Sequence, residues 1–334
     1  MTPAARTQAA IELLDSIIVS ARDGGPAADT LIARYFASRR YAGSKDRRAV
    51  RTLVYEAIRT LGERPASGRA AMVTLAVTNA ELAATFDGST HGPAPIEGGE
   101  GAIRTGLAPA WLQDALQRSG LDRKAISALL GRAPLDIRVN ALMGTRDDAL
   151  ALFPGATTID AAPAALRLPA DTAVERSPAL EGGLVEVQDA GSQIVTGAAG
   201  AAAGMTVVDL CAGAGGKTLA LAAAMANQGA ILACDIDRPR LSRLMPRAER
   251  AGVTIAETSL LDPGREAERL SDWQAAADLV LIDAPCSGTG TWRRNPEARW
   301  RLTPDRLDRL VTTQARLLAL AADCTRPGGR ITYI

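Results

Sequence analysis

VVDLCAGAGGKT, at residues 207–218, joins an apolar run to a glycine-rich turn and then to an alanine-rich segment. The apolar run ends at Asp209, and the turn contains Gly213, Gly215 and Gly216. Glycine permits a left-handed backbone and lets a ligand come close, and the free N–H groups where a helix begins attract electron-rich ligand groups. The pattern therefore predicts a strand, a glycine turn and a helix that together bind a cofactor.

The spacing of the glycines excludes two common nucleotide-binding loops. A P-loop would need glycine in place of Cys211, and the GxGxxG dinucleotide pattern would need glycine in place of Thr218. What remains is an acid, three residues and then GxGG. A second acid, Asp235, ends the next apolar run about 20 residues further on, where it could accept hydrogen bonds from ribose hydroxyls. Asp237 competes for this role, and a plain helix cap or turn is the alternative for Asp235.

Strand-like and helical segments alternate around this loop throughout residues 188–334, which predicts a parallel sheet with helices on both faces. Upstream, residues 133–187 contain short apolar runs broken by Pro, Gly and Asp, and we expect a small β-containing linker subdomain there. Residues 1–132 show helical periodicity, clearest in the helix expected to start at a Ser44 cap. The strands expected in the sheet are 206–210, 230–234, 253–257, 279–282 and 330–334.

The composition narrows the class of protein. Among 334 residues, 47% are hydrophobic and 22% charged, and the net charge is only +1, as in an ordinary globular protein. No apolar run approaches the ~20 residues that would span a bilayer, so we expect a cytoplasmic protein with no membrane partner. The four cysteines form no CxxC pair and the single histidine, His91, lies in a presumed loop, so no metal site is expected.

The second informative stretch is LIDAPCSGTG, residues 281–290, which follows a buried apolar run. Cys286 could be a small buried apolar residue, but Asp283, Pro285 and two glycines favour a loop at the carboxyl edge of the sheet. Carbon 5 of cytosine is a poor nucleophile, and addition of a thiolate at carbon 6 activates it. A cysteine in such a loop therefore suits covalent catalysis on a pyrimidine.

The sequence resembles the bacterial ribosomal RNA cytosine-5 methyltransferases of the Sun type. Residues 211–218 resemble the family's motif I, although Gly213 and Ala214 stand where alanine and proline are commoner. Residues 283–290 resemble motif IV. Further similarity lies in VQDA at 187–190, and in DRRA at 46–49 and LVY at 53–55, which resemble a NusB-like helical RNA-binding domain.

The resemblance implies a Rossmann-like methyltransferase domain that uses S-adenosyl-L-methionine, preceded by an all-α NusB-like domain and a small α+β linker. Asp262, which follows the third expected strand, could hold the adenine amino group. Cys286, flanked by Asp283 and Pro285, would assist release of the methylated product. The residues implied to contact the cofactor are Cys211, Ala212, Gly213, Ala214, Gly215, Gly216, Lys217, Asp235, Asp262 and Asp283.

By the same resemblance, the attacking cysteine lies in a later Thr-Cys-Ser-like segment after a Gly-Gly-strand run. That run is RPGGRITYI, residues 326–334, and the expected nucleophile would follow Ile334. Cys324 precedes the Pro-Gly-Gly turn and cannot replace it. We therefore expect a methyltransferase domain truncated before its last strands: either the chain binds the cofactor weakly and is inactive, or it is a fragment of a longer gene. Attack by Cys286, as DNA cytosine methyltransferases attack from a Pro-Cys, is the alternative.

RNA contacts are expected from arginines, because basic side chains bind phosphates. One cluster contains Arg47, Arg48 and Arg51, for which a solvated helix face is an equal alternative. The other contains Arg293 and Arg294, close to Arg299, Arg301 and the indoles of Trp292 and Trp300, which could stack on unpaired bases. Tryptophan packed in the core, Trp300 above all, is the alternative for this second cluster. A methyltransferase that acts on proteins or small molecules is a rival interpretation. The loop around Cys286 argues against it, because methylation of an amine needs no thiol. A non-catalytic RNA-binding protein with a degenerate methyltransferase half remains the rival.

Overall fold

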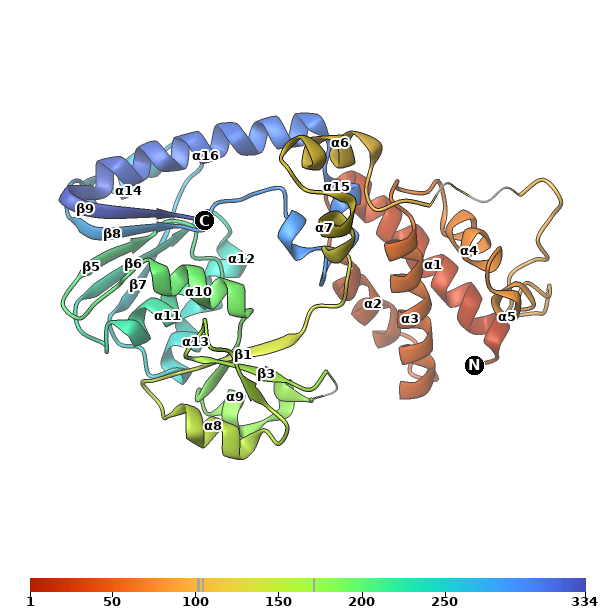
Figure 1. Ribbon diagram of the computed structural model, residues 1–334, viewed down its shortest axis with the longest axis horizontal. Coiled ribbons are helices and arrows are strands. Elements are labelled where there is room, and N and C mark those ends of the chain that lie inside the picture. The colour runs from red at the N-terminus through yellow and green to blue at the C-terminus, as the bar shows by residue number, and fades with distance from the viewer. Residues whose placement is uncertain (101–102, 104, 171) are drawn as a thin grey trace. The chain divides into compact units, whose positions relative to one another are not determined.

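The computed structural model describes residues 1–100, 103, 105–170 and 172–334 (Figure 1). Within them, a helical unit comprises Met1–Ala133 and Ser287–Leu307, and an α/β unit comprises Pro134–Cys286 and Asp308–Ile334. The division between Ala133 and Pro134 falls where the sequence changes from helical periodicity to short apolar runs. None of the described helices is long and apolar enough to cross a bilayer.

The helical unit is built around the first helix, which packs against α3 and α4. Thr2 caps α1 by accepting a hydrogen bond from the Ala5 N–H, and Gly24 ends it with a left-handed φ of 75°. On α3 the side chains of Val50, Val54, Ala57 and Ile58 are buried, as their helical spacing predicted. Ser44 is the first residue of α3, and the cap position is Gly43, so the Ser44 cap was wrong. The helices are α1 Pro3–Asp23, α2 Ala28–Ala37, α3 Ser44–Thr60, α4 Gly68–Ala76, α5 Ala80–Ala83, α6 Ala110–Arg118, α7 Arg123–Ala128 and α15 Ala298–Arg301, with the 3-10 turn η3 Thr289–Thr291.

The small sheet of the α/β unit has the order β2-β3-β1-β4, and its neighbouring strands run antiparallel. Ile137 pairs with Leu166 on one side and with Val187 on the other, and one face of the sheet buries an aliphatic cluster. Its strands are β1 Leu135–Val139, β2 Thr157–Thr158, β3 Ala165–Leu168 and β4 Val185–Val187, with α8 Arg146–Leu152, η1 Val174–Arg176 and α9 Pro178–Glu181.

The larger sheet is parallel, in the order β7-β6-β5-β8-β9. Successive strand residues face opposite sides: Val207 joins the core beneath α11 and α13, and Val208 joins the core beneath α16. Figure 1 shows α16 on one side of the sheet and α11 and α13 on the other. Helices thus cover both faces, which confirms the predicted Rossmann-like architecture. The elements are α10 Ala190–Ala198, β5 Thr206–Asp209, α11 Gly216–Ala224, β6 Ala230–Asp235, α12 Arg238–Leu241, α13 Leu244–Arg250, β7 Ala256–Leu260, α14 Glu266–Arg269, η2 Ser271–Trp273, β8 Ala277–Ile282, α16 Pro304–Cys324 and β9 Thr325–Tyr333.

One strand lies later than predicted. The run 253–257 was expected to form the third strand, but β7 begins at Ala256. The N–H of Val253 donates to the Ala248 carbonyl, so Val253 closes the turn after α13 while its side chain stays buried in the core. In the sequence, a buried apolar residue in a turn cannot be distinguished from one in a strand. The predicted strand therefore began three positions too early.

Candidate active site at the carboxyl edge of the parallel sheet

The glycine loop connects β5 to α11, and two of its glycines have a left-handed backbone conformation. Gly213 and Gly215 have φ values of 56° and 88°, and Gly215 occupies the cap position of α11. A Cβ atom on Gly215 would lie 2.6 Å from Leu244 Cγ, and one on Gly213 would lie 2.8 Å from Arg240 Nη2. A side chain at position 215 would therefore displace Leu244, whereas at position 213 the flexible Arg240 side chain could move aside. The Ala212 N–H donates to the Cys234 carbonyl of β6 over 2.8 Å, which fixes the loop against the neighbouring strand.

Asp209, the acid that precedes the loop, is completely buried. Its Oδ2 accepts a hydrogen bond from Thr218 Oγ1 of α11 over 2.7 Å. Its Oδ1 is buried without a hydrogen-bond partner among the described residues. Burial raises the pKa of Asp209 to about 7, because a carboxylate loses its hydration inside the protein, while the Thr218 hydrogen bond opposes this shift.

Asp235 ends β6 and is 8% exposed. Its Oδ2 accepts the Gly213 N–H over 2.7 Å, and its Oδ1 accepts the Asp237 N–H over 2.7 Å. This carboxylate therefore orients the glycine loop directly, a contact that the sequence did not predict. Asp262, two residues after β7, is exposed, and its backbone carbonyl accepts the Arg265 N–H. Parallel strands place both acids at the same edge of the sheet as the glycine loop.

An ion pair joins the glycine loop to the loop after β8. Lys217 Nζ lies 2.5 Å from Asp283 Oδ2, and the two side chains are 13% and 42% exposed. Lys217 is in the first turn of α11, and Asp283 directly follows β8. The two motifs that the sequence singled out are therefore in direct contact.

Cys286 lies three residues beyond Asp283 and is exposed. Pro285, before it, accepts a hydrogen bond at its carbonyl from Gln314 Nε2 of α16 over 2.9 Å, so the loop is fixed to a helix. The other three thiols are less exposed than that of Cys286. Burial raises the pKa of Cys211 to about 12, and it also raises the pKa values of Cys234 and Cys324. Cys324 packs in the core beneath α16, as expected of a structural residue.

The arginines predicted to bind RNA belong to the helical unit. Arg47, Arg48 and Arg51 are exposed on α3, and Arg293 and Arg294 are exposed in the segment that follows Cys286 in the sequence. Asp46 does not neutralise its basic neighbours, because it pairs with Arg6 of α1 at 2.8 Å. Several of these arginines line a pocket of about 600 Å³. Its basic lining residues are Arg48, Arg51, Arg59, Arg132 and Arg294.

The expected stacking role of the two indoles was wrong. Trp292 is 0% exposed and Trp300 is 3% exposed, and the Trp300 Nε1–H donates to the Leu61 carbonyl over 3.0 Å. Arg299, from the same basic cluster, is also 0% exposed. Arg301 donates to the backbone carbonyls of Gly25 and Pro26. These side chains anchor residues 287–307 in the helical unit, and the sequence had placed that segment in the methyltransferase domain.

The site fits the cofactor that the motifs predicted. A Cβ atom built on Gly216 would meet no protein atom within 4 Å, so open space adjoins the beginning of α11. Acids at the ends of β6 and β8, and Asp262 shortly after β7, offer acceptors for hydroxyl and amino groups, and the helix N-terminus offers N–H donors. Among the described residues no group of His, Cys, Asp or Glu is arranged to hold a metal ion.

Comparisons with known proteins identify the family of this part of the chain. Residues 201–334 match the family model described as 16S rRNA methyltransferase RsmB/F. The chain is 35% identical over 233 residues to ribosomal RNA small subunit methyltransferase B of Enterobacter sp. (strain 638), covering 68% of this chain and 54% of that protein. It is 34% identical over 236 residues to a probable methyltransferase B of Synechocystis sp., covering 67% and 52%. The chain thus spans about half the length of the curated relatives it matches.

Solved structures share the fold. The crystal structure of PH0851 superposes with a TM-score of 0.75 at 22% identity, covering 100% of this chain and 85% of that one. The structure of NSun6 from Pyrococcus horikoshii with SFG gives a TM-score of 0.58 at 17% identity, covering 67% and 82%. The matched family consists of S-adenosylmethionine-dependent enzymes, as the motifs predicted. The resemblance inferred from the motifs is thereby confirmed, and residues 201–334 form a methyltransferase domain of the RsmB/F family.

Proposed function

We propose that this protein transfers a methyl group from S-adenosylmethionine to carbon 5 of a cytosine in ribosomal RNA through a covalent cysteine adduct. The observation that supports this most directly is the Lys217–Asp283 ion pair. It joins the glycine loop, which suits the cofactor, to the loop that carries the exposed thiol of Cys286. A methyltransferase that acts on an amine needs no such thiol, whereas carbon 5 of cytosine does.

The cofactor is proposed to lie along the carboxyl edge of the parallel sheet. The loop from Cys211 to Lys217 would curve under its amino-acid end, with Asp283 beside Lys217. Asp235 would accept hydrogen bonds from the ribose hydroxyls, because each of its oxygens uses one acceptor site within the protein and retains another. Asp262 is exposed and could accept from the adenine amino group. When bound, S-adenosylmethionine supplies an electrophilic methyl group.

The base is proposed to react in two stages. A cysteine thiolate adds to carbon 6 of cytosine, forming a carbon–sulfur bond and making carbon 5 nucleophilic enough to take the methyl group. A base then removes the proton from carbon 5, and the electron pair left behind expels the thiolate. We assign Cys286 to this second stage, in which it assists release of the methylated product.

The resemblance assigns the first stage to a different cysteine in a later segment. Cys211, Cys234 and Cys324 do not suit it, because burial raises the pKa of each thiol and disfavours the thiolate. We therefore propose that these 334 residues contain the thiol for release and not the thiol for attack. On that basis the 334-residue chain should bind S-adenosylmethionine weakly and should not methylate RNA.

Deletion of the gene in its own host tests the proposed function. Mass spectrometry of ribosomal RNA should show that one 5-methylcytosine is lost, and that the wild-type gene restores it. A gene carrying Cys286→Ala should instead accumulate protein covalently attached to RNA, because the adduct forms but is not resolved. The Asp235→Ala gene, which weakens cofactor binding, should give neither methylation nor adduct.

The outcomes separate the alternatives. Unchanged 5-methylcytosine after deletion would overturn the proposal. Methylation of RNA by the purified 334-residue chain, abolished by Cys286→Ala, would make Cys286 the attacking residue. If the purified chain binds RNA but shows no stabilisation by S-adenosylmethionine, it is an RNA-binding protein with a degenerate methyltransferase half.

A further inference from the structure

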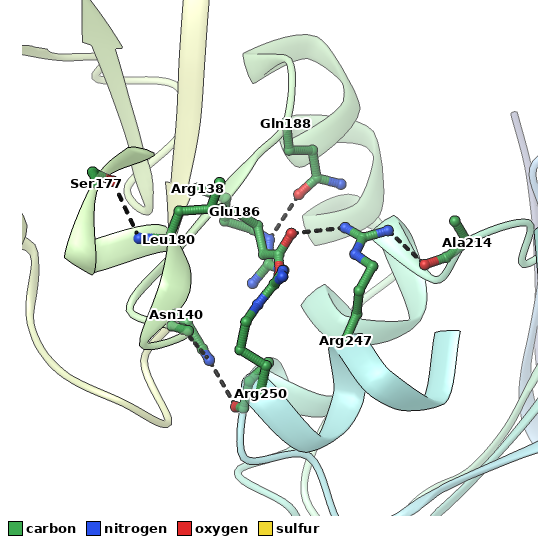
Figure 2. A network of polar contacts seen from close by, with 11 residues as sticks. Arg138, Asn140, Ser177, Leu180, Glu186, Gln188, Ala214, Arg247 and Arg250 are labelled. Carbon is green, nitrogen blue, oxygen red and sulfur yellow. Dashed lines mark hydrogen bonds and ion pairs between the residues drawn. The ribbon is translucent and has the colours of Figure 1, made fainter. Parts of the chain in front are cut away.

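A charged network, buried at Glu186 and Arg138 and half-buried at Arg247 and Arg250, contacts the glycine loop. Figure 2 shows Arg247 of α13 between two acceptors: its Nη1 donates to the Ala214 carbonyl over 2.5 Å, and its Nη2 donates to Glu186 Oε2 over 2.7 Å. Glu186 belongs to β4 of the small sheet and is 4% exposed. Arg250, one turn further along α13, donates to the other oxygen of the same carboxylate.

A second connection runs beside the first. Arg138 of β1, 4% exposed, donates from Nε to Gln188 Oε1 over 2.7 Å. Gln188 in turn donates from Nε2 to the Gly216 carbonyl over 3.3 Å. The network therefore holds two carbonyls of the glycine loop, Ala214 and Gly216, one on each side of Gly215. In the sequence, Gln188 lies 28 positions from Gly216, and Arg247 lies 33 positions from Ala214.

Holding a carbonyl also orients the N–H group of the same peptide plane, because the peptide bond is rigid. The hydrogen bond from Arg247 to the Ala214 carbonyl thus fixes the direction of the Gly215 N–H, which donates to the Ala212 carbonyl over 2.9 Å. A loop rich in glycine would otherwise sample many conformations, and ordering it on binding would cost affinity.

We propose that Arg247, fixed by Glu186, is a positioning residue that keeps the glycine loop in its cofactor-binding conformation before the cofactor arrives. The proposal rests on the function proposed above for the glycine loop. It gives the small sheet, which had been expected only as a linker, a defined part in cofactor binding. Arg250 provides a matched control, because among the described hydrogen bonds it donates to the same glutamate and not to the loop.

The test compares Arg247→Met with Arg250→Met in the complete chain. Calorimetric titration should show S-adenosylmethionine binding about ten-fold weaker in Arg247→Met, equivalent to about 1.4 kcal/mol, and within about two-fold of wild type in Arg250→Met. Hydrogen exchange of the cofactor-free proteins should show faster exchange of the Gly213, Gly215 and Lys217 amides in Arg247→Met alone.

The two readouts distinguish this inference from the proposed function. If wild-type protein fails to bind S-adenosylmethionine, the proposed function fails, but the amide exchange still tests the positioning of the loop. If both variants lose the same affinity for S-adenosylmethionine and their glycine-loop amides exchange equally fast, the ion pairs of Glu186 stabilise the fold in general. That result would overturn the inference. Unchanged exchange in Arg247→Met would overturn it as well.

Discussion

The stability of the fold depends on pH through a single buried residue, Asp209. The carboxyl group is completely buried beside the glycine loop and hydrogen-bonded to Thr218. Its pKa is raised from an ordinary 3.8 to about 7 by burial. Between these two values the folded protein keeps a proton that the unfolded chain releases. Stability therefore falls as the pH rises from about 4 to about 7, and above 7 the full cost of the buried charge is present.

Asp209→Asn should remove this dependence. The amide oxygen can still accept the Thr218 hydroxyl, but no charge forms as the pH rises. The free energy of unfolding of the variant, relative to wild type, should increase by on the order of 4 kcal/mol between pH 4 and pH 8. Urea unfolding at a series of pH values measures this difference. A wild-type profile parallel to that of the variant would show that Asp209 does not titrate in this range.

At the scale of secondary-structure elements, helix ends in the helical unit are capped by residues far away in sequence. Arg299 donates to the carbonyls of Ile58, Arg59 and Leu61 where α3 ends. The Ala28 N–H at the start of α2 donates to Glu297 Oε1 over 3.0 Å, where the local cap residue offers no side-chain acceptor. One short segment thus satisfies the unpaired groups of two helices.

Arg299→Met should destabilise the helical unit by about 3 kcal/mol, because it leaves several buried carbonyls without a donor. Urea unfolding followed by tryptophan fluorescence measures the change, since Trp300 lies in the same contact. Arg306→Met, at an exposed position of the same segment, is the control and should change stability by less than about 0.5 kcal/mol. Equal stabilities of the two variants would contradict this assignment of Arg299.

For the whole molecule, the clustering of charge matters more than its sum. The net charge is only +1, yet five arginines line one pocket of the helical unit with Glu56 as its acidic residue. Burial lowers the pKa of Arg59, and the neighbouring Arg132 lowers it further. This concentration of positive charge favours an anion, and a phosphate of RNA is the anion we propose for this pocket.

Replacing Arg48, Arg51 and Arg294 by Gln should weaken RNA binding and flatten its salt dependence. Each lost phosphate contact should reduce the slope of log K against log salt by about 0.7 to 0.9, so the triple variant should lose roughly two units. Filter binding over a range of salt concentrations measures the slope. Replacement of the exposed residues Arg265, Arg269 and Arg309 of the α/β unit removes the same charge and should leave the slope nearly unchanged. Equal slopes for both triple variants would refute the proposal that this pocket binds an RNA phosphate.

Local patterns in the sequence were sufficient to bring together the residues of the proposed cofactor site. Asp209, the glycines of residues 213–216 and the acid at Asp235 follow from strand, turn and helix signals that lie within a few positions of each other. Because parallel strands share one carboxyl edge, the same patterns also placed Asp283 and Cys286 at that edge. These features depend on short-range geometry, and that is why the sequence alone determined them.

Contacts between distant segments were decided only by the tertiary structure. Trp300 and Arg299 have the local signature of an exposed basic and aromatic cluster, and only their packing against the end of α3, about 240 residues earlier, shows that they are buried. Likewise, nothing near Arg247 in the sequence indicates that its side chain donates both to Glu186 and to the Ala214 carbonyl, 33 positions away. Whether a side chain is buried or ion-paired depends on which distant segment packs against it. The periodicity of a segment carries no information about which other segment that will be.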